Sequence, residues 1–244
     1  MSDNNLKLWE SVSKTDTKFT KYVEIGKRKF TSISPMYQKR EATNAFGPQG
    51  INWGVVLGSE KFDYREIGDT TLLVYTAVMY FTHEGSRGEI PIAATEKLSY
   101  KTAGTNGYLK IDDEADKKVK TNALTKGLSE LGFSADIFLG LFDDVEYKQL
   151  RKLESDLARA ENFEVEQKDG FDETLTWLNR EISTIKLLKS ESVITMVTNK
   201  IDCNLKDKMK ILKASKPKLD SYIKKLHDAA QSTINQLKSK QNGK

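Results

Sequence analysis

The sequence predicts an α+β fold, in which an antiparallel β-meander of about four strands packs with helices and a helical C-terminal extension follows. Residues 51–100 contain four runs rich in β-branched and aromatic residues, separated by turn residues, which is typical of antiparallel strands. Apolar residues at helical spacing flank these runs. Because 18 of the 22 aromatic residues precede residue 151, we place the core in residues 1–150 and expect a helical, lysine-rich region over 151–244.

A hairpin and a helix are predicted before the strands. Residues 20–34, TKYVEIGKRKFTSIS, favour a strand or hairpin. The basic triplet at 27–29 either contacts a partner or protects an exposed strand edge from aggregation. Ser34 and Pro35 are typical of a helix start, and Gly47 is typical of a helix end.

The stretch FGPQGINWG, residues 46–54, connects this helix to the first strand. Its proline prevents the helix from continuing, and its glycines allow a tight turn. We expect Trp53 to pack in the core or at a subunit interface, because buried aromatic residues outnumber stacking platforms.

A second helix is predicted over residues 112–132, DDEADKKVKTNALTKGLSELG. Acidic residues at its start suit the positive end of the helix dipole, and Gly132 is typical of its end. One side is apolar and is formed by Val119, Ala123, Leu124, Gly127, Leu128 and Leu131. The opposite side is polar and is formed by Lys118, Asn122, Thr125 and Ser129, with Lys117 and Lys126 on its flanks.

The C-terminal region is predicted to be helical. Residues 143–162 and 170–189 have helical patterns, and a further pair of helices is expected within 203–238, interrupted near Pro217. Residues 205–244 contain 11 lysines and three aspartates, a net charge of +8 in a chain whose total is +4. Such a basic tail indicates either contact with a polyanion or partner protein, or a solvated lysine-rich helix.

Composition excludes several classes of protein. One cysteine, Cys203, and two histidines cannot form a disulfide or a structural zinc site. No apolar run approaches the roughly 20 residues of a membrane span, and the N-terminus lacks the pattern of a signal peptide. The sequence therefore predicts a soluble, cytoplasmic protein that needs no cofactor, no metal and no membrane.

Motifs of common enzymes are missing as well. The sequence has no G-x-x-x-x-G-K-[ST] phosphate loop, no dinucleotide-binding fingerprint and no Ser/His/Asp arrangement. Acidic clusters at 112–114 and 143–144 leave open a metal-dependent nuclease, although both lie where a helix would begin and the helix dipole explains them without metal. Basic, aromatic and glycine residues without a motif for ATP hydrolysis favour a protein that binds single-stranded nucleic acid.

Two motifs resemble a known family. The segments PMYQKREATNAFGPQGINWG and DDEADKKVKTNALTKGLSELGFSADIFLGLFDDVEY are similar to phage and prophage single-strand annealing proteins of the Rad-fifty-two-type (Sak/Erf-like) recombination superfamily. The most specific parts are the F-G-P-x-G-x-x-W-G corner and the K-T-[ND]-A-L-x-K-[AG]-L-x-x-L-G-F helix. The resemblance covers about residues 30–150.

This resemblance implies a non-enzymatic function. Such proteins bind single-stranded DNA without sequence specificity and anneal complementary strands without ATP during homologous recombination, here in a bacterial host cell. Their α+β core forms homo-oligomeric rings or helical filaments, and a basic groove between the sheet hairpin, here residues 60–98, and the following helix, here 113–131, holds the strand. A phage exonuclease or a host single-strand-binding protein is the expected partner.

The resemblance also implies which residues contact DNA. Lys126 and Lys117 match basic groove positions, and Lys118 and Lys120 extend them. The sequence departs from its relatives at Thr125 and Ser129, where eukaryotic members carry basic residues. Further contacts are expected from the preceding helix and the hairpin tip. The predicted nucleic-acid-binding residues are Lys39, Arg40, Arg87, Lys117, Lys118, Lys120, Thr125 and Lys126.

Two alternative functions stay open at this point. One is the metal-dependent nuclease, in which Asp113 and Asp143 would be essential. The other is a passive module that coats single-stranded DNA or assists replication proteins, and that would slow annealing rather than accelerate it.

Overall fold

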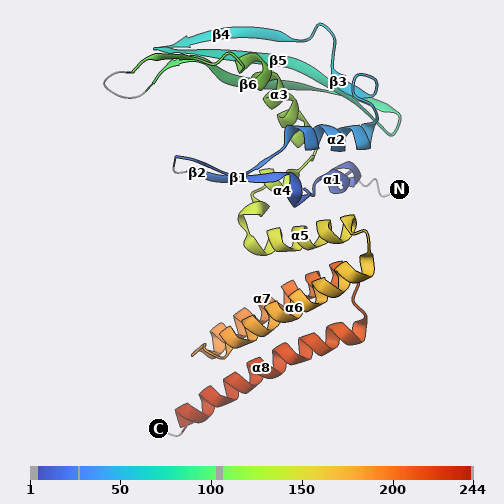
Figure 1. The fold of residues 1–244 in the computed structure, drawn as a ribbon, viewed down its shortest axis with the longest axis vertical. Coiled ribbons are helices and arrows are strands. Elements are labelled where there is room, and N and C mark those ends of the chain that lie inside the picture. Colours follow the sequence, from blue (N-terminus) through green and yellow to red (C-terminus); the bar gives the residue numbers. More distant parts are fainter. Residues whose placement is uncertain (1–4, 27, 103–106, 243–244) are drawn as a thin grey trace. The chain divides into compact units, whose positions relative to one another are not determined.

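The computed structural model describes residues 5–26, 28–102 and 107–242, which form two compact units (Figure 1). Unit 1 comprises Met1–Asp143, and unit 2 comprises Asp144–Lys244. Unit 1 combines helices with a five-stranded and a two-stranded antiparallel sheet, whereas unit 2 is helical. The predicted α+β class with a helical C-terminal region is therefore confirmed.

The predicted domain boundary lies a few residues beyond the one in the structure, and two predicted lysines are not described. The boundary expected at residue 150 falls inside helix α5, Val145–Arg159, which belongs to unit 2. Lys27 and Lys244, members of the two predicted basic segments, lie outside the described residues.

Unit 1 begins with short helices and the predicted hairpin. The elements are α1 (Lys7–Val12), η1 (Thr17–Phe19), β1 (Thr20–Ile25), β2 (Arg28–Ile33) and α2 (Pro35–Phe46). Pro35 is the first residue of α2, and Gly47, with a φ of 100°, ends it. The predicted hairpin and helix are both confirmed.

The main sheet contains the four strands predicted within residues 51–100 and one additional strand, at residues 109–111. Its strands are β3 (Trp53–Val55), β4 (Lys61–Ile67), β5 (Thr70–His83), β6 (Ser86–Lys101) and β7 (Leu109–Ile111). Strands β4, β5, β6 and β7 pair in sequence order, and β3 joins the same edge of β5 as β4 does. Glycine at position 85, with a φ of 78°, forms the tip of the long β5–β6 hairpin.

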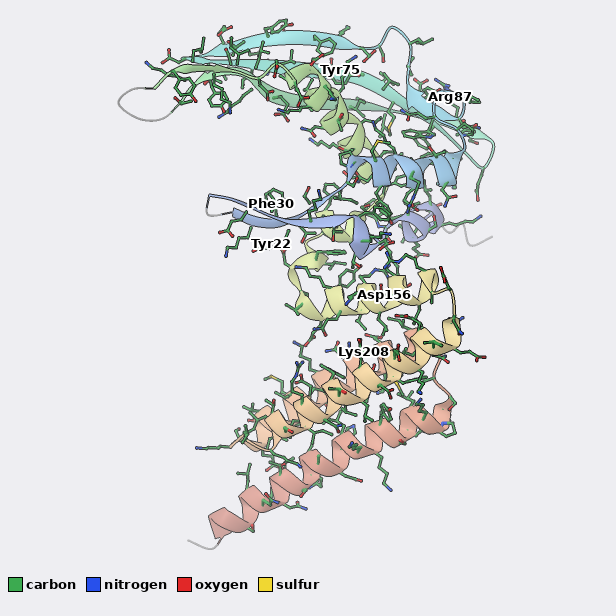
Figure 2. All side chains as sticks on the ribbon, viewed as in Figure 1. Tyr22, Phe30, Tyr75, Arg87, Asp156 and Lys208 are labelled. Carbon is green, nitrogen blue, oxygen red and sulfur yellow. The ribbon has the colours of Figure 1, made fainter. Side chains whose placement is uncertain are left out.

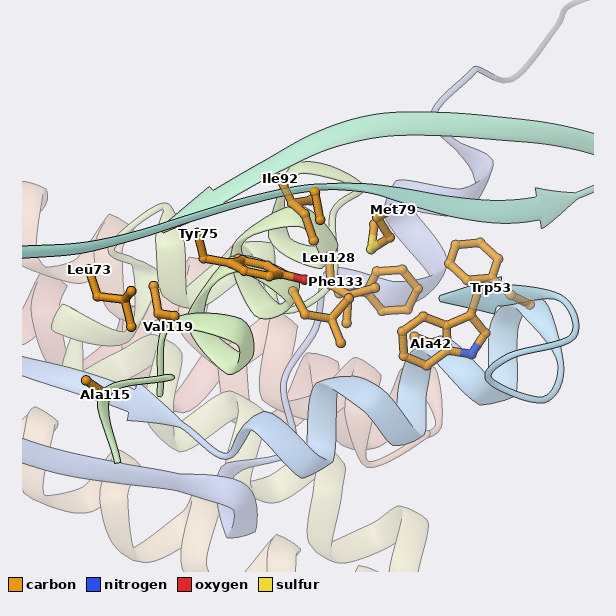
Figure 3. Close-up of a cluster of buried hydrophobic side chains, with 14 residues drawn as sticks. Ala42, Trp53, Leu73, Tyr75, Met79, Ile92, Ala115, Val119, Leu128 and Phe133 are labelled. Atoms are coloured by element: carbon orange, nitrogen blue, oxygen red, sulfur yellow. The ribbon is translucent and has the colours of Figure 1, made fainter. Parts of the chain in front are cut away.

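Helix α3 (Ala115–Glu130) covers one face of this sheet and builds the core with it (Figure 3). The predicted apolar side is buried: Val119, Ala123 and Leu128 are each 0 % exposed. Gly127 lets the helix approach β6 closely, since a Cβ there would lie 2.5 Å from Ile92 Cγ2. The sequence pattern therefore gave the correct buried face.

Trp53 belongs to the same core. Its side chain is 0 % exposed, and it clusters with Phe46 and Phe133. The prediction that Trp53 packs inside the protein is confirmed, and its indole is not accessible to a nucleic-acid base.

A buried polar contact joins the two ends of unit 1. The N–H of Thr15 donates to Asp136 Oδ2 at 2.8 Å, and the Thr15 hydroxyl donates to Oδ1 at 2.6 Å. Asp136 lies in α4 (Ala135–Phe138), which is followed by η2 (Leu141–Asp143). The contact fastens the segment after α1 to the end of the core, and desolvated hydrogen bonds of this kind are costly to leave unmade.

Residues 144–242, the described part of unit 2, form four helices around an aliphatic core. They are α5, α6 (Phe163–Ile185), α7 (Glu191–Ile211) and α8 (Lys216–Asn242). Leu178, Ile194 and Leu205 are 0 % exposed in this core. Helix α7 begins at Glu191, before the predicted position of 203, because β-branched residues of 193–198 pack in the core and tertiary burial overrides their weak helix propensity.

Candidate nucleic-acid interface

The main sheet of unit 1 has two unlike faces, since successive side chains of a strand point to opposite sides. Phe81 lies on the covered face, where its ring contacts the Phe46 ring of α2 at 5.3 Å. Tyr80 lies on the other side, which we call the open face. Helices α2 and α3 both lie on the covered side in Figure 1, and no helix of the described part of unit 1 packs on the open face.

The solvent-facing side of α3 carries two of the predicted lysines. The Lys117 side chain is 77 % exposed, and its Nζ lies 3.5 Å from Glu114 Oε1. Lys118 is held more firmly, because its Nζ lies 2.7 Å from Asp112 Oδ2. This hydrogen bond raises the pKa of Lys118 and lowers the pKa of Asp112. Lys117 is consequently the freer of the two cations.

Thr125 lies on the same side of α3. Its hydroxyl donates to the carbonyl oxygen of Thr121 at 3.0 Å, which is a common arrangement for threonine in a helix. The hydroxyl oxygen can still accept a hydrogen bond, but it cannot replace the positive charge that the resemblance implies at this position.

Lys120 lies at the edge of α3 nearest to β4 and has structural contacts. Its Nζ lies 3.0 Å from Glu60 Oε1 and 5.2 Å from the centre of the Phe62 ring. The Tyr75 hydroxyl also donates to Glu60, at 2.8 Å. Hydrogen bonds from Lys120 and Tyr75 lower the pKa of Glu60, whereas burial raises the pKa of Tyr75. Lys120 therefore helps to fix β4 to the core.

Lys126 lies on the opposite side of α3, near β6. It is exposed and lines a shallow hollow with Ala93 and Glu130. Within the part of the chain that the structure describes, it forms no ion pair. Lys126 is thus available to a ligand, but it does not lie in one row with Lys117 and Lys120.

The two predicted residues of α2 differ in their surroundings. The Arg40 guanidinium lies 4.6 Å from the centre of the Phe19 ring and forms an ion pair of 2.9 Å with Glu41. Phe19 in turn stacks on Tyr37, with ring centres 4.8 Å apart. Arg40 therefore helps to hold the base of the β1–β2 hairpin, whereas Lys39 is half-buried and has no ion pair among the described residues.

Arg87 lies at the end of the long hairpin, on the open face (Figure 2). Its guanidinium is 4.3 Å from the centre of the Tyr80 ring and 2.7 Å from Glu89 Oε1. Arg87 is thus separated from the α3 lysines by the sheet itself. The structure brings Lys117 and Lys118 together but not all eight predicted residues.

Sequence reasoning did not single out the exposed aromatic residues of the β1–β2 hairpin. Tyr22 is 62 % exposed and Phe30 is 42 % exposed (Figure 2). Among the described residues both strands pair only with each other, so the hairpin is not part of the main sheet. The β-branched and aromatic residues of this segment predicted a strand or hairpin, but they contained no signal for how little of it is buried.

Acidic residues at helix starts have local partners. Asp144 accepts hydrogen bonds from the backbone N–H groups of Glu146 and Tyr147, at 2.7 and 3.4 Å. Asp112 accepts from the N–H of Glu114 as well as from Lys118. Among the described residues, no group of three or more His, Cys, Asp or Glu side chains could hold a metal ion.

The described helices also include none with the length and apolar character that a membrane span requires.

Lysines of unit 2 contact aromatic rings of α6. The Nζ atoms of Lys208, Lys213 and Lys218 lie 5.1, 4.8 and 3.2 Å from the ring centres of Trp177, Phe163 and Phe171, respectively. Lys206 and Lys238 form ion pairs with Asp202 and Glu191, both at 2.8 Å. Much of the predicted basic tail is thus engaged within unit 2 itself.

A comparison of the sequence with models of protein families and with curated proteins found no match.

Proposed function

We propose that this chain binds single-stranded DNA without sequence specificity and anneals complementary strands without ATP. The observation that carries the proposal is the division of α3: its apolar side builds the core, while Lys117, Lys118 and Thr125 remain on its outer side. Cations and hydroxyls of this kind bind phosphate and sugar oxygens and do not read bases. The two motifs that resemble single-strand annealing proteins support the same function.

The chemistry of annealing requires no motor. Pairing of complementary strands is favourable by about 1.4 kcal/mol per base-pair step on average. An annealing protein has to keep each strand unfolded and reduce the repulsion between phosphates. Lysine side chains achieve this by displacing condensed counterions, so binding becomes weaker as the salt concentration rises.

The unpaired edges of the main sheet support homo-oligomerisation. Strand β6 pairs with β7 only over residues 99–101, so 86–98 have no partner strand on that side among the described residues. The outer edge of β4 is equally unpaired in the described chain. A β4 edge of one copy that pairs with a β6 edge of the next is a head-to-tail contact, which generates a ring or a helical filament.

We also propose that the lysine-rich unit 2 docks a partner, either an exonuclease that produces the single strands or a single-strand-binding protein of the host. This assignment comes from the resemblance and from the net charge of the C-terminal segment.

The central experiment measures annealing of two complementary, fluorescently labelled oligonucleotides without nucleotide or metal. The protein should accelerate duplex formation at low salt. Replacement of Lys117 and Lys126 by alanine should weaken single-strand binding about tenfold, because each lost phosphate contact reduces the counterion release.

The matched control removes two lysines of unit 2 that already form ion pairs, Lys206→Ala with Lys238→Ala. This variant has the same net charge as the first one and should anneal like the unaltered protein. Equal losses in both variants would mean that only total charge matters. A protein that binds the strands but slows their pairing is a passive coating module, and that result contradicts the proposal.

A further inference from the structure

The open face of the main sheet concentrates positive charge in one half. Arg65 of β4, Leu72 of β5 and Lys97 of β6 lie in one register across three strands. Lys110 of β7 pairs with Tyr100 of β6 in a neighbouring register. Because adjacent strands lie about 4.8 Å apart, the backbones at Arg65 and Lys97 are about 10 Å apart.

Few carboxylates oppose these cations. The half of the open face between Lys61 and Lys110 carries one acidic side chain within the described strands, Asp63, whose Oδ2 lies 4.0 Å from Arg65 Nε. Asp69 lies at its margin, in the turn that connects β4 with β5. Lys61, Lys97 and Lys110 form no ion pair among the described residues. By contrast, Arg87 in the other half is neutralised by Glu89.

An aromatic ring lies between two of the lysines. The Lys97 and Lys110 amines are 5.2 and 6.0 Å from the centre of the Tyr100 ring. Lys97 lies on the open face because it is in register with Leu72, and these contacts therefore place all three side chains there. No bulky side chain precedes them on the open face of β6, because Thr95 and Ala93 are small and exposed.

We propose that this half of the open face is a binding surface for single-stranded DNA, separate from the α3 lysines. Lys97, Lys110 and Arg65 would contact the phosphates, and Tyr100 would contact a sugar or base. Cations that follow the backbone, combined with an aromatic side chain, are the features by which proteins hold single strands without reading the sequence. The nature of the ligand rests on the proposed function, whereas the location does not.

This location has a consequence for pairing. A sheet separates the open face from α3, so one subunit can hold DNA at two surfaces. A strand on the open face meets strand backbones and short side chains rather than a deep groove, which leaves bases accessible to a complementary strand.

The test uses the full chain and fluorescence anisotropy of a labelled oligodeoxythymidine over a range of salt concentrations. Lys97→Ala combined with Lys110→Ala should weaken binding about tenfold and reduce the slope of log K against log salt by about 1.4, which corresponds to two phosphate contacts on a single strand. Thermal melting followed by circular dichroism checks that the variant remains folded.

Lys101→Ala is the matched control for Lys97→Ala. Both lysines are exposed on β6, but Lys101 pairs with Leu109 and, by alternation, points to the covered side. The single Lys97→Ala variant should bind several-fold more weakly than the Lys101→Ala variant. Equal affinities for these two variants, or an unchanged salt slope in the double variant, would overturn the proposal.

Parallel measurements separate this inference from the proposed function. If the unaltered protein does not bind single-stranded DNA, both are wrong. If it binds and anneals, and the Lys117/Lys126 variant is impaired while the Lys97/Lys110 variant is not, only the open-face site is wrong. If the Lys97/Lys110 variant loses affinity for duplex DNA alone, the surface takes a duplex, which also contradicts the proposal.

Discussion

Units 1 and 2 differ in how they use charge. Residues 1–143 contain 19 basic and 19 acidic residues, whereas residues 144–244 contain 20 and 16. The excess charge thus lies in unit 2, yet lysines there are engaged with aromatic rings or carboxylates, as Lys213 is with Phe163. Unit 1 has no net charge, but its basic and acidic residues are not all paired with each other. Cations such as Lys97 and Lys126 lack an ion-pair partner within the described chain. Net charge alone therefore does not show which cations are free to bind single-stranded DNA.

The cores of the two units differ in composition as well. The largest fully buried side chains of unit 1 include Trp53, Tyr75 and Phe133, whereas those of unit 2 are aliphatic, such as Leu178 and Leu205. An aromatic core that joins a sheet to helices is built from contacts distant in sequence. A helical core relies more on contacts between successive helices.

The variant with the largest expected effect tests whether the two cores unfold independently. Trp53→Ala should destabilise unit 1 by about 3–5 kcal/mol, because it leaves a large cavity in a close-packed core. Hydrogen exchange followed by mass spectrometry should then show loss of protection in β3, β5 and α3 and unchanged protection in α6–α8. Leu205→Ala is the reciprocal variant, and joint loss of protection in both units would contradict the division.

An intermediate effect concerns the glycines at which helices approach their neighbours. A Cβ on Gly127 would lie 2.5 Å from the branched methyl of Ile92, and one on Gly170 would lie 2.5 Å from Leu212 Cδ2. Ile92 is stiff at χ1, whereas the end of the Leu212 side chain can rotate. Gly127→Ala should therefore lower the free energy of unfolding of unit 1 by about 1–2 kcal/mol, even after the gain in helix propensity.

Gly170→Ala should leave the free energy of unfolding almost unchanged, because rotation of the Leu212 side chain relieves the clash and alanine favours the helix. Chemical denaturation of both variants measures the difference. An equal cost at both positions would show that the flexibility of the neighbouring side chain is unimportant.

The smallest expected effect is a pH dependence of folding stability, which has a different physical cause in each unit. The pKa of Glu60 lies below its ordinary value of 4.5 because of hydrogen bonds from Lys120 and Tyr75. Its contribution to stability is thus complete above about pH 4.5 and is lost as the pH falls through the folded-state pKa. Because the Glu60 side chain is 42 % exposed, we expect less than about 1 kcal/mol of stability from it, measured as a reduced acid sensitivity of melting in Glu60→Gln.

The pKa of Lys208 in unit 2 is also lowered, but by burial rather than by hydrogen bonds. Burial lowers its pKa below 10.5, so the folded chain binds fewer protons than the unfolded chain in that range. The stability of unit 2 should rise as the pH increases through the folded-state pKa, and Lys208→Met should remove this rise. A Lys208→Met variant with the same alkaline pH profile as the unaltered protein would exclude the effect.

Much of the fold was predictable from local patterns. The apolar side of α3, the Pro35 start and Gly47 end of α2, and the β5–β6 hairpin all follow from short-range rules of periodicity and backbone conformation. Pairing of β3 with the same edge of β5 as β4 was not predictable, because strand order depends on contacts between distant segments.

The candidate site was less predictable than the fold. Residue type and spacing indicated Lys120 as a DNA contact, but not that Glu60 and Phe62, from another strand, would surround its amine. Conversely, Lys97 and Lys110 are 13 positions apart in the sequence and carry no motif. Only the strand register brings them to the same ring, that of Tyr100.

The hydrogen bonds between Thr15 and Asp136 have a consequence for biosynthesis. They join residues 121 positions apart, and at ordinary rates of translation that interval takes about 6–24 s. During this time the emerging N-terminal segment has no Asp136 to bind. Closure of unit 1 by these hydrogen bonds can therefore occur only after Asp136 has been synthesised, whatever order the sheet and helices follow earlier.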